Sequence, residues 1–356
     1  MILTVSPKME ILALNLTEDS EETQYCFPNL KGSCLRSQTL ILIKVAMYIC
    51  MGFIILMTVC GNLLVIISIS HFRQLHSPTN LIILSLAFAD WFLGAFVMPY
   101  TMITYVENCW YFGETFCKIH TSTDITLCVA SLLHLGLISA DRYLAICKPL
   151  QYRTSVTMHK VAALIGIIWM FSFSFGFGVI LSQVNLVSGE ELFINYCTGS
   201  CILFFSKEKA MVAVFVAFFI PGSVMLALYM KIFCVAKVQA RKINFSLAMT
   251  RAQCDKKCTS EHRERKAAKT LAIVLGAFLL CWFPFIMVLV VDPFFDYSTP
   301  TVVFEAFGWL GGFNSTCNPL IYGFFYPWFR RVFKIIISGK VFQNGSSLLN
   351  IYAERN

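Results

Sequence analysis

The sequence predicts an all-α membrane protein, a bundle of seven transmembrane helices, from its composition, its long apolar segments and the placement of its basic residues. The chain has 356 residues, of which 57% are hydrophobic and 13% charged. Its mean hydropathy is +0.70. A soluble domain of this length needs more charged surface, so the composition favours the membrane class.

Seven apolar segments are long enough to cross a bilayer, which takes about 20 residues of helix. They lie near residues 45–69, 78–106, 116–147, 161–181, 210–235, 267–291 and 301–325. A long stretch of polar and mixed residues precedes the first segment, so it does not read as a cleavable signal peptide. We therefore expect a bundle over 44–326.

Basic residues predict the orientation of the bundle, because cytoplasmic loops carry the excess of Lys and Arg. They concentrate between the fifth and sixth segments, in a third cytoplasmic loop at about 236–266, and again after the seventh segment. Residues 1–43 are then extracellular, and Asn15, in Asn-Leu-Thr, is a predicted glycan acceptor. The net charge of +8 fits membrane topology and anionic lipid, not nucleic acid.

The segment 327–340, which begins PWFRRVFKIII, predicts an amphipathic helix on the inner membrane surface. Trp328 and Phe333 would face lipid, and Arg330 and Lys334 the headgroups. A simple stop-transfer cluster of charges remains compatible with this pattern. Residues 341–356 then form a cytoplasmic tail.

Asp90 and Asp124 stand out because ionisable residues inside spans are costly and usually mark function. His134 also lies mid-span, where a hydrogen-bonded packing role is the simpler interpretation. No hydrolase, P-loop or metal-binding motif occurs in a sensible context, so the chain does not read as an enzyme. A receptor or a transporter remains, and the odd number of spans without an internal repeat disfavours a transporter.

Short motifs spread over all seven spans narrow the class. They are GNLLV at 61–65, LAFAD at 86–90, DRY at 141–143, Trp169, Pro221, CWFP at 281–284 and NPLIY at 318–322. Together they resemble the rhodopsin-like, class A G-protein-coupled receptors. A second set matches the fingerprint of the trace amine-associated receptors: Asn314, Ser315, Asn318, Pro319, Tyr322, Tyr326, Trp328 and Phe329.

The resemblance implies a plasma-membrane receptor for a small amine that signals through a stimulatory G protein to raise cyclic AMP. Arrestin and a receptor kinase are implied partners, as is an olfactory role in ciliary membrane. The switch residues that it implies are Asp141, Arg142, Tyr229, Glu264, Phe278 and Tyr322. Arg142 would pair with Glu264 in the closed state, and separation of the pair would admit the G protein.

The resemblance also implies two sites at the depth of the membrane. Asp90, Ser131, Asn314 and Asn318 would hold an allosteric sodium ion, because carboxylate, hydroxyl and amide oxygens suit a hard cation. No other cofactor is expected. A protonated Asp90 hydrogen-bonded to the two asparagines is the alternative. The ligand site would comprise Asp124, Ile125, Cys128, Ala213, Ala217, Trp282, Phe285, Ile286, Trp309 and Gly312.

Three departures from relatives shape the expected ligand. Ala213 and Ala217 stand where catecholamine receptors carry serines, which disfavours catechols, and Ala213 lacks the second carboxylate with which some fish relatives read diamines. A monoamine such as phenylethylamine or an alkylamine is therefore favoured, although Glu190 and Glu191 keep diamines open. Gly312 replaces a family tyrosine that donates to the aspartate, unless it merely allows close helix packing. A serotonin- or histamine-type receptor is the runner-up.

Six cysteines fall outside the membrane, where disulfides persist. They are Cys26, Cys34, Cys109, Cys117, Cys197 and Cys201. From the residues alone, Cys117 can pair with either loop cysteine. We predict Cys117–Cys201 and a second bridge, Cys26–Cys197, for which Cys34 competes with Cys26.

Overall fold

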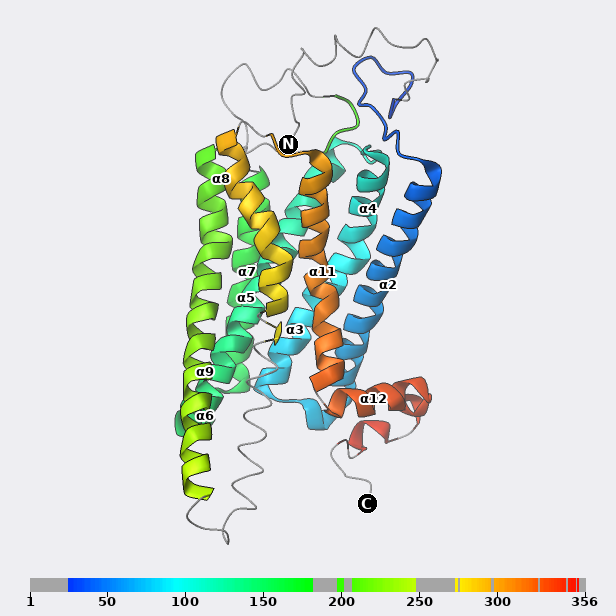
Figure 1. Cartoon of the computed structure of the whole chain (residues 1–356). Coiled ribbons are helices and arrows are strands. Elements are labelled where there is room, and N and C mark those ends of the chain that lie inside the picture. Colours follow the sequence, from blue (N-terminus) through cyan, green and yellow to red (C-terminus); the bar gives the residue numbers. More distant parts are fainter. Residues whose placement is uncertain are drawn as a thin grey trace.

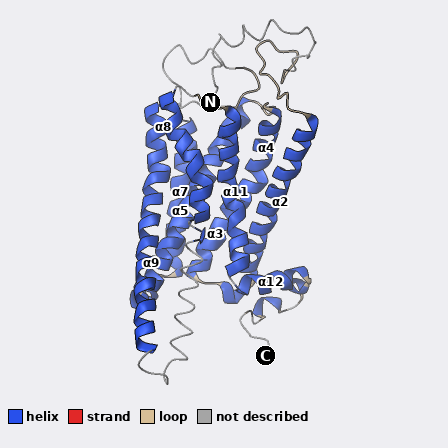
Figure 2. Ribbon diagram, viewed as in Figure 1, coloured by secondary structure: helices blue, strands red, loops and turns tan. Residues whose placement is uncertain are grey.

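The computed structural model describes residues 25–181, 197–201, 207–247, 273–274, 276–295, 298–325, 327–343, 345–349 and 351. Within these residues the regular structure is helical, and extended pairing is limited to two isolated bridges near one end of the bundle. This end carries Tyr25 and is called the outer end after the predicted orientation, and the opposite end is called the inner end. Figures 1 and 2 show long helices running side by side as one bundle. The predicted all-α membrane fold is confirmed.

The helices follow the predicted spans closely. They are α2 (Ile41–His71), α3 (Pro78–Phe92), α4 (Met98–Glu107), α5 (Glu114–Cys147), α6 (Pro149–Ser155), α7 (Met158–Leu181), α8 (Lys207–Val214), α9 (Ile220–Leu247), α11 (Thr301–Phe325) and α12 (Pro327–Ile337). Five of the described helices are long and apolar enough to span a membrane, and the described Gly276–Val291 is a shorter apolar helix. The proline-bearing α11 packs against α2 and α3.

Two wide helical turns shape the outer half of the bundle. Leu93–Val97 joins α3 to α4, and Phe215–Phe219 joins α8 to α9, each as a π-helical turn just before a proline, Pro99 or Pro221. Proline lacks an N–H and disturbs the preceding turn, which favours such a local widening. Each turn changes which side chains of the following helix face the bundle interior.

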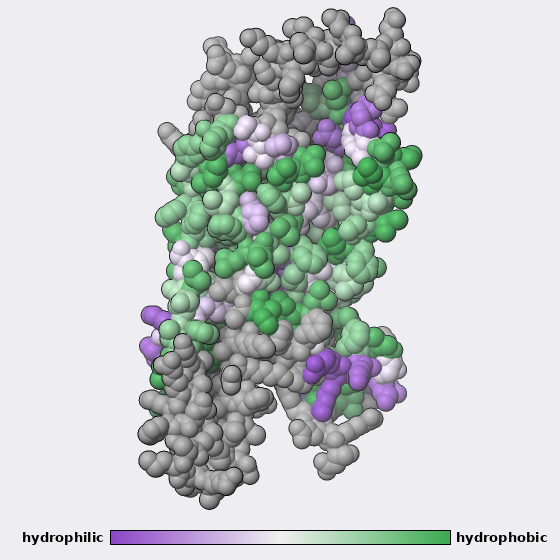
Figure 3. All heavy atoms as spheres, in the orientation of Figure 1, coloured by the Kyte–Doolittle hydropathy of each residue, from purple (hydrophilic) through white to green (hydrophobic). Residues whose placement is uncertain are grey.

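Helix α5 lies at the centre, packed on α3, α7 and α9. Its His134 is fully buried and bonds the Ala130 carbonyl at 2.6 Å and Ser85 Oγ at 2.8 Å. Trp169 Nε1 donates to the same Ser85 oxygen at 2.9 Å. Both ring nitrogens of His134 therefore have hydrogen-bond partners, as expected for a residue with a packing role. Figure 3 shows a predominantly apolar surface over the middle of the bundle, as lipid contact requires.

Three disulfides tie the outer segments together. Cys117 pairs with Cys201, as predicted. The predicted Cys26–Cys197 bridge is wrong: Cys26 pairs with Cys109, and Cys34 with Cys197. The backbone explains the exchange, because Ser33 bridges Thr198 and so brings the neighbouring Cys34 to Cys197. The structure also uses Cys109, which had no predicted partner.

The segment after these bridges is held by Glu107 at the end of α4. Arg36 Nη2 lies 2.6 Å from Glu107 Oε2, and Lys44 Nζ lies 3.1 Å from the same atom. Tyr48 OH donates to Glu107 Oε1 at 3.2 Å. The hydrogen bond to Glu107 raises the pKa of Arg36 further, so the guanidinium stays charged.

At the inner end, α12 lies across the foot of the bundle (Figure 1). It exposes Arg330 and Phe333, as an amphipathic surface helix should. The prediction that Trp328 faces lipid is wrong: Trp328 is buried with Phe329 and Val332 in the core of the bundle. The helix stops at Ile337, short of the predicted 340, and a left-handed Gly339 follows.

Candidate functional site

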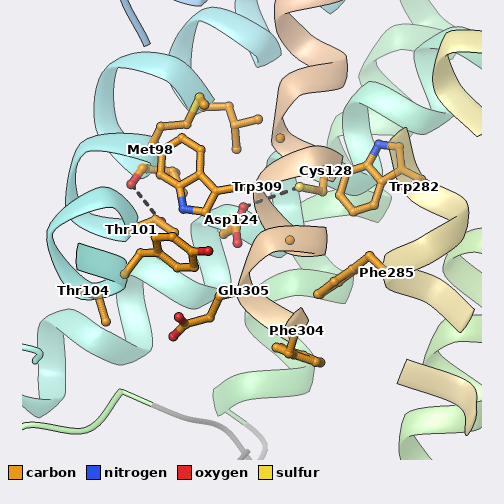
Figure 4. A pocket seen from close by; sticks show the side chains of 15 residues that line it. Met98, Thr101, Thr104, Asp124, Cys128, Trp282, Phe285, Phe304, Glu305 and Trp309 are labelled. Atoms are coloured by element: carbon orange, nitrogen blue, oxygen red, sulfur yellow. Dashed lines mark hydrogen bonds between the residues drawn. The ribbon is translucent and has the colours of Figure 1, made fainter. Parts of the chain in front are cut away.

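A cavity of about 230 Å³ opens between α4, α5, α11 and the Gly276–Val291 helix. Its lining residues are Leu93, Val97, Met98, Thr101, Thr104, Tyr105, Asp124, Cys128, Trp282, Phe285, Phe304, Glu305, Gly308, Trp309 and Gly312. Figure 4 shows the labelled side chains converging from these helices. Sites for drug-sized ligands usually measure about 300 Å³ or more, so this cavity suits a small molecule.

Asp124 presents a carboxylate to this cavity from the third turn of α5. Cys128, one turn further along, donates its thiol to Asp124 Oδ1 at 3.4 Å. Among the described residues this weak donor is its one hydrogen-bond partner. A carboxylate in apolar surroundings needs a cation or strong donors, so the arrangement can bind an ammonium group through a charge-assisted hydrogen bond.

Aromatic rings form the wall around Asp124. The Trp282 and Phe285 centroids lie 6.2 Å apart, and those of Phe285 and Phe304 lie 5.1 Å apart. Aromatic faces attract cations and bury apolar tails. Trp309 Nε1 is buried and, within the described part of the chain, has no hydrogen-bond partner. This donor is available to a ligand or to water.

Six of the predicted ligand residues line the cavity: Asp124, Cys128, Trp282, Phe285, Trp309 and Gly312. The other four, Ile125, Ala213, Ala217 and Ile286, are not among its lining residues. Ile125 and Ile286 each follow a lining residue, and one step along a helix turns a side chain by about 100°. Ala213 lies in the last turn of α8, and Ala217 lies in the wide turn Phe215–Phe219 that follows it.

Gly312 leaves open space at the cavity wall. A Cβ built there would meet only Met98 Cε, at 3.9 Å, whereas one on the adjacent Gly311 would lie 3.1 Å from the Trp282 ring. At Gly61 a Cβ would come within 2.7 Å of Pro319. Close packing therefore accounts for Gly61, and the packing alternative for Gly312 finds no support.

The most consequential residue missed from the sequence is Glu305, a second carboxylate on the cavity wall. Its position was predictable from helical periodicity. Glu305, Trp309 and Gly312 follow the i, i+4, i+7 spacing of one helix face, so placing Trp309 and Gly312 in the site also places Glu305 there.

Asp90 lies in a second polar cluster and is fully buried. Its Oδ1 accepts hydrogen bonds from Ser131 at 3.1 Å and Ser315 at 2.7 Å, and its Oδ2 accepts one from Asn318 at 2.7 Å. Ser315 was not among the predicted sodium ligands. The predicted Asn314 is buried and directly precedes Ser315 in α11.

The oxygens around Asp90 fit a hard cation in kind. Asn62 donates to the Ser315 carbonyl at 3.1 Å, and its own Oδ1 is buried without a partner among the described residues. A water or an ion could satisfy this unpaired oxygen. Sodium binding remains a prediction.

At the inner end, Asp141 and Arg142 form a network with neighbouring polar side chains. Arg142 contacts Asp141 Oδ2 and Thr79 Oγ1. Tyr152 donates its hydroxyl to Asp141 Oδ1 at 2.9 Å, and burial raises the pKa of this tyrosine. Glu264, the predicted partner of Arg142, lies outside the described residues.

The other predicted switch residues, Tyr229, Phe278 and Tyr322, are buried together in the core of the inner half. Phe278 stacks on Phe218 with centroids 5.7 Å apart. The interior of this half of the bundle is thus closed and well packed.

This fold and this site define a receptor of seven membrane-spanning helices: residues 61–322 match the 7 transmembrane receptor (rhodopsin family). Trace amine-associated receptor 4 of Rattus norvegicus is 45% identical over 94% of this chain and 96% of its own length. Trace amine-associated receptor 1 of Homo sapiens is 44% identical over 93% of this chain and 98% of its own length. Trace amine-associated receptor 13c of Danio rerio is 42% identical over 94% of this chain and 98% of its own length. The chain belongs to the trace amine-associated receptors, within the class A G-protein-coupled receptors.

Membership of this family establishes a multi-pass plasma-membrane receptor, not an enzyme, with an amine ligand and a G protein as partners. A transporter is thereby excluded.

Proposed function

We propose that Asp124 binds the ammonium group of the agonist, with the aromatic wall enclosing its tail. The observation that carries this proposal is a carboxylate with one weak thiol partner at the wall of a small aromatic cavity. A primary monoamine with an aryl or alkyl tail, such as phenylethylamine, satisfies the charge and fills apolar space. The cavity offers no residue corresponding to the serines that bind catechols, because Ala213 and Ala217 occupy those positions.

We propose further that the activated receptor couples to a stimulatory G protein and raises cyclic AMP, with arrestin and a receptor kinase ending the signal. Family resemblance supports these partners and an olfactory role in ciliary membrane. In the closed state Arg142, which contacts Asp141, would also pair with Glu264. The N-terminus would lie outside the cell and carry a glycan on Asn15; Glu264 and Asn15 both lie outside the described residues.

A cyclic-AMP reporter assay with a panel of amines tests the proposal. Asp124→Ala should abolish the response while surface expression persists, because an unpaired buried ammonium costs about 2–5 kcal/mol. The exposed Glu114, which pairs with Lys118 at 2.8 Å, supplies the matched control Glu114→Ala. Unchanged potency in Asp124→Ala would refute the amine site, and selective activation by serotonin or histamine would favour the runner-up class.

A further inference from the structure

Glu305 gives the cavity a second carboxyl group, at a different height from Asp124. It lies one turn after the start of α11 at Thr301, near the outer end of the bundle. Gly312, lower on the same helix face, is seven residues away, or about 10 Å along the axis at about 1.5 Å per residue. Figure 4 shows Asp124 and Glu305 as separate carboxylates along the cavity, with Trp309 beside Asp124.

The described part of the chain gives Glu305 no positive partner. The basic side chains that form ion pairs at this end contact other carboxylates: Arg36 and Lys44 bind Glu107, and Lys118 binds Glu114. Glu305 is only partly exposed and follows Phe304, whose ring packs on Phe285. A partly buried carboxylate in a cavity lined by aromatic rings gains from an ammonium partner.

The wall between the two carboxylates is mainly apolar and aromatic. The lining shared by the two carboxylates includes Met98, Phe285 and Trp309, and it also carries the hydroxyl side chains Thr101, Thr104 and Tyr105. A molecule complementary to a carboxylate at each end and an apolar wall between them has two cationic ends and a hydrocarbon middle. A monoamine would satisfy Asp124 and leave Glu305 without a cation.

We propose that Glu305 is a specificity-determining residue that binds the second ammonium group of an α,ω-diaminoalkane whose first ammonium binds Asp124. This inference rests on the proposed amine site and changes the ligand class favoured by the sequence. That preference for monoamines depended on the absence of a carboxylate at Ala213, and α11 supplies one from another side of the cavity.

The test measures binding of diaminoalkanes of graded chain length, each compared with the n-alkylamine of the same length. Purified full-length receptor in lipid nanodiscs is used, so binding does not depend on the G protein. At the best-fitting length, the wild type should bind the diamine about tenfold more tightly than the monoamine, the value of one hydrogen bond to a charged group. Glu305→Gln should remove most of that ratio, and the exposed control Glu114→Gln should retain it.

Each outcome decides between the two proposals. If the wild type binds monoamines through Asp124 but prefers no diamine at any length, or if Glu305→Gln keeps the preference, the role of Glu305 is refuted and the amine site stands. If the wild type binds no amine, the proposed function fails and this inference fails with it. If Glu305→Gln binds nothing, Glu305→Asp decides: a retained diamine preference supports the inference, and a lost one refutes it.

Discussion

The two membrane-embedded aspartates differ in what surrounds them. Asp90 accepts hydrogen bonds from Ser131, Ser315 and Asn318, which join α3 to α5 and α11. Asp124 receives one thiol contact within the described residues, and its other side faces the cavity. The protein thus completes the hydrogen bonding of one carboxylate and leaves that of the other to a ligand. Both aspartates are conspicuous in the sequence. Only their hydrogen-bond partners distinguish Asp90, which links helices, from Asp124, the proposed ligand-binding residue.

Removal of the Asp90 carboxylate should have the largest effect on stability. Asp90→Ala leaves three donors facing a small apolar side chain, and each unsatisfied buried donor costs about 1–3 kcal/mol. Thermal unfolding of the ligand-free receptor should therefore show a clear loss of stability. The control is Asp124→Ala, which leaves only the weak thiol donor of Cys128 without its acceptor. Equal losses in the two variants would remove the distinction between the two aspartates.

Addition of a donor beside Asp124 should make it resemble Asp90. Gly312 has space for a larger side chain, so Gly312→Tyr can place a hydroxyl near the carboxylate. Response to small primary amines should strengthen by up to about 1.5–3 kcal/mol, while N,N-dimethylated analogues weaken because the tyrosine fills their space. The matched control is Gly323→Ala on the same helix, outside the cavity lining, whose Cβ would make an ordinary contact of 3.7 Å with the Phe329 ring. An unchanged rank order of primary and tertiary amines would show that the vacant volume does not select ligands.

Sodium gives the smallest predicted effect and concerns Asp90 alone. If the ion joins the oxygens around Asp90, replacing potassium with sodium at constant ionic strength should stabilise the wild type by about 1 kcal/mol when sodium exceeds its Kd several-fold. Asp90→Asn should lose this dependence. A sodium effect that survives in Asp90→Asn would locate the ion elsewhere, and no effect in the wild type would favour the protonated alternative.

Much of the fold was predictable, because the length of the apolar segments predicts the membrane spans and the basic residues of the loops predict their orientation. Asp90 and Asp124 were predictable for the same reason, since a charge inside a span needs an explanation. Ser315 was missed because a serine carries no such signal. Glu305 was missed although it lies within the predicted seventh segment, since a charge near a helix end is readily assigned to the outer surface.

The disulfides show where sequence alone falls short. Six cysteines allow many pairings, and spacing does not choose among them. The choice depends on the backbone pairing of Ser33 with Thr198, a contact between segments far apart in the chain. The cavity wall is similar: the wide turns before Pro99 and Pro221 set which residues face inward, and the seven-span pattern does not reveal them.

One reciprocal measurement tests the contrast between the aspartates most directly. Asp90→Asn and Asp124→Asn keep side-chain size and remove one charge each, and both are assayed for ligand-free thermal stability and for stabilisation by phenylethylamine. We predict that Asp90→Asn lowers ligand-free stability, by about 1–3 kcal/mol, because its amide meets three donors. Asp124→Asn should stay near wild type without ligand, within about 0.5 kcal/mol, and lose stabilisation by the amine. Amine stabilisation that persists in Asp124→Asn, together with a matching loss of ligand-free stability in both variants, would contradict the account.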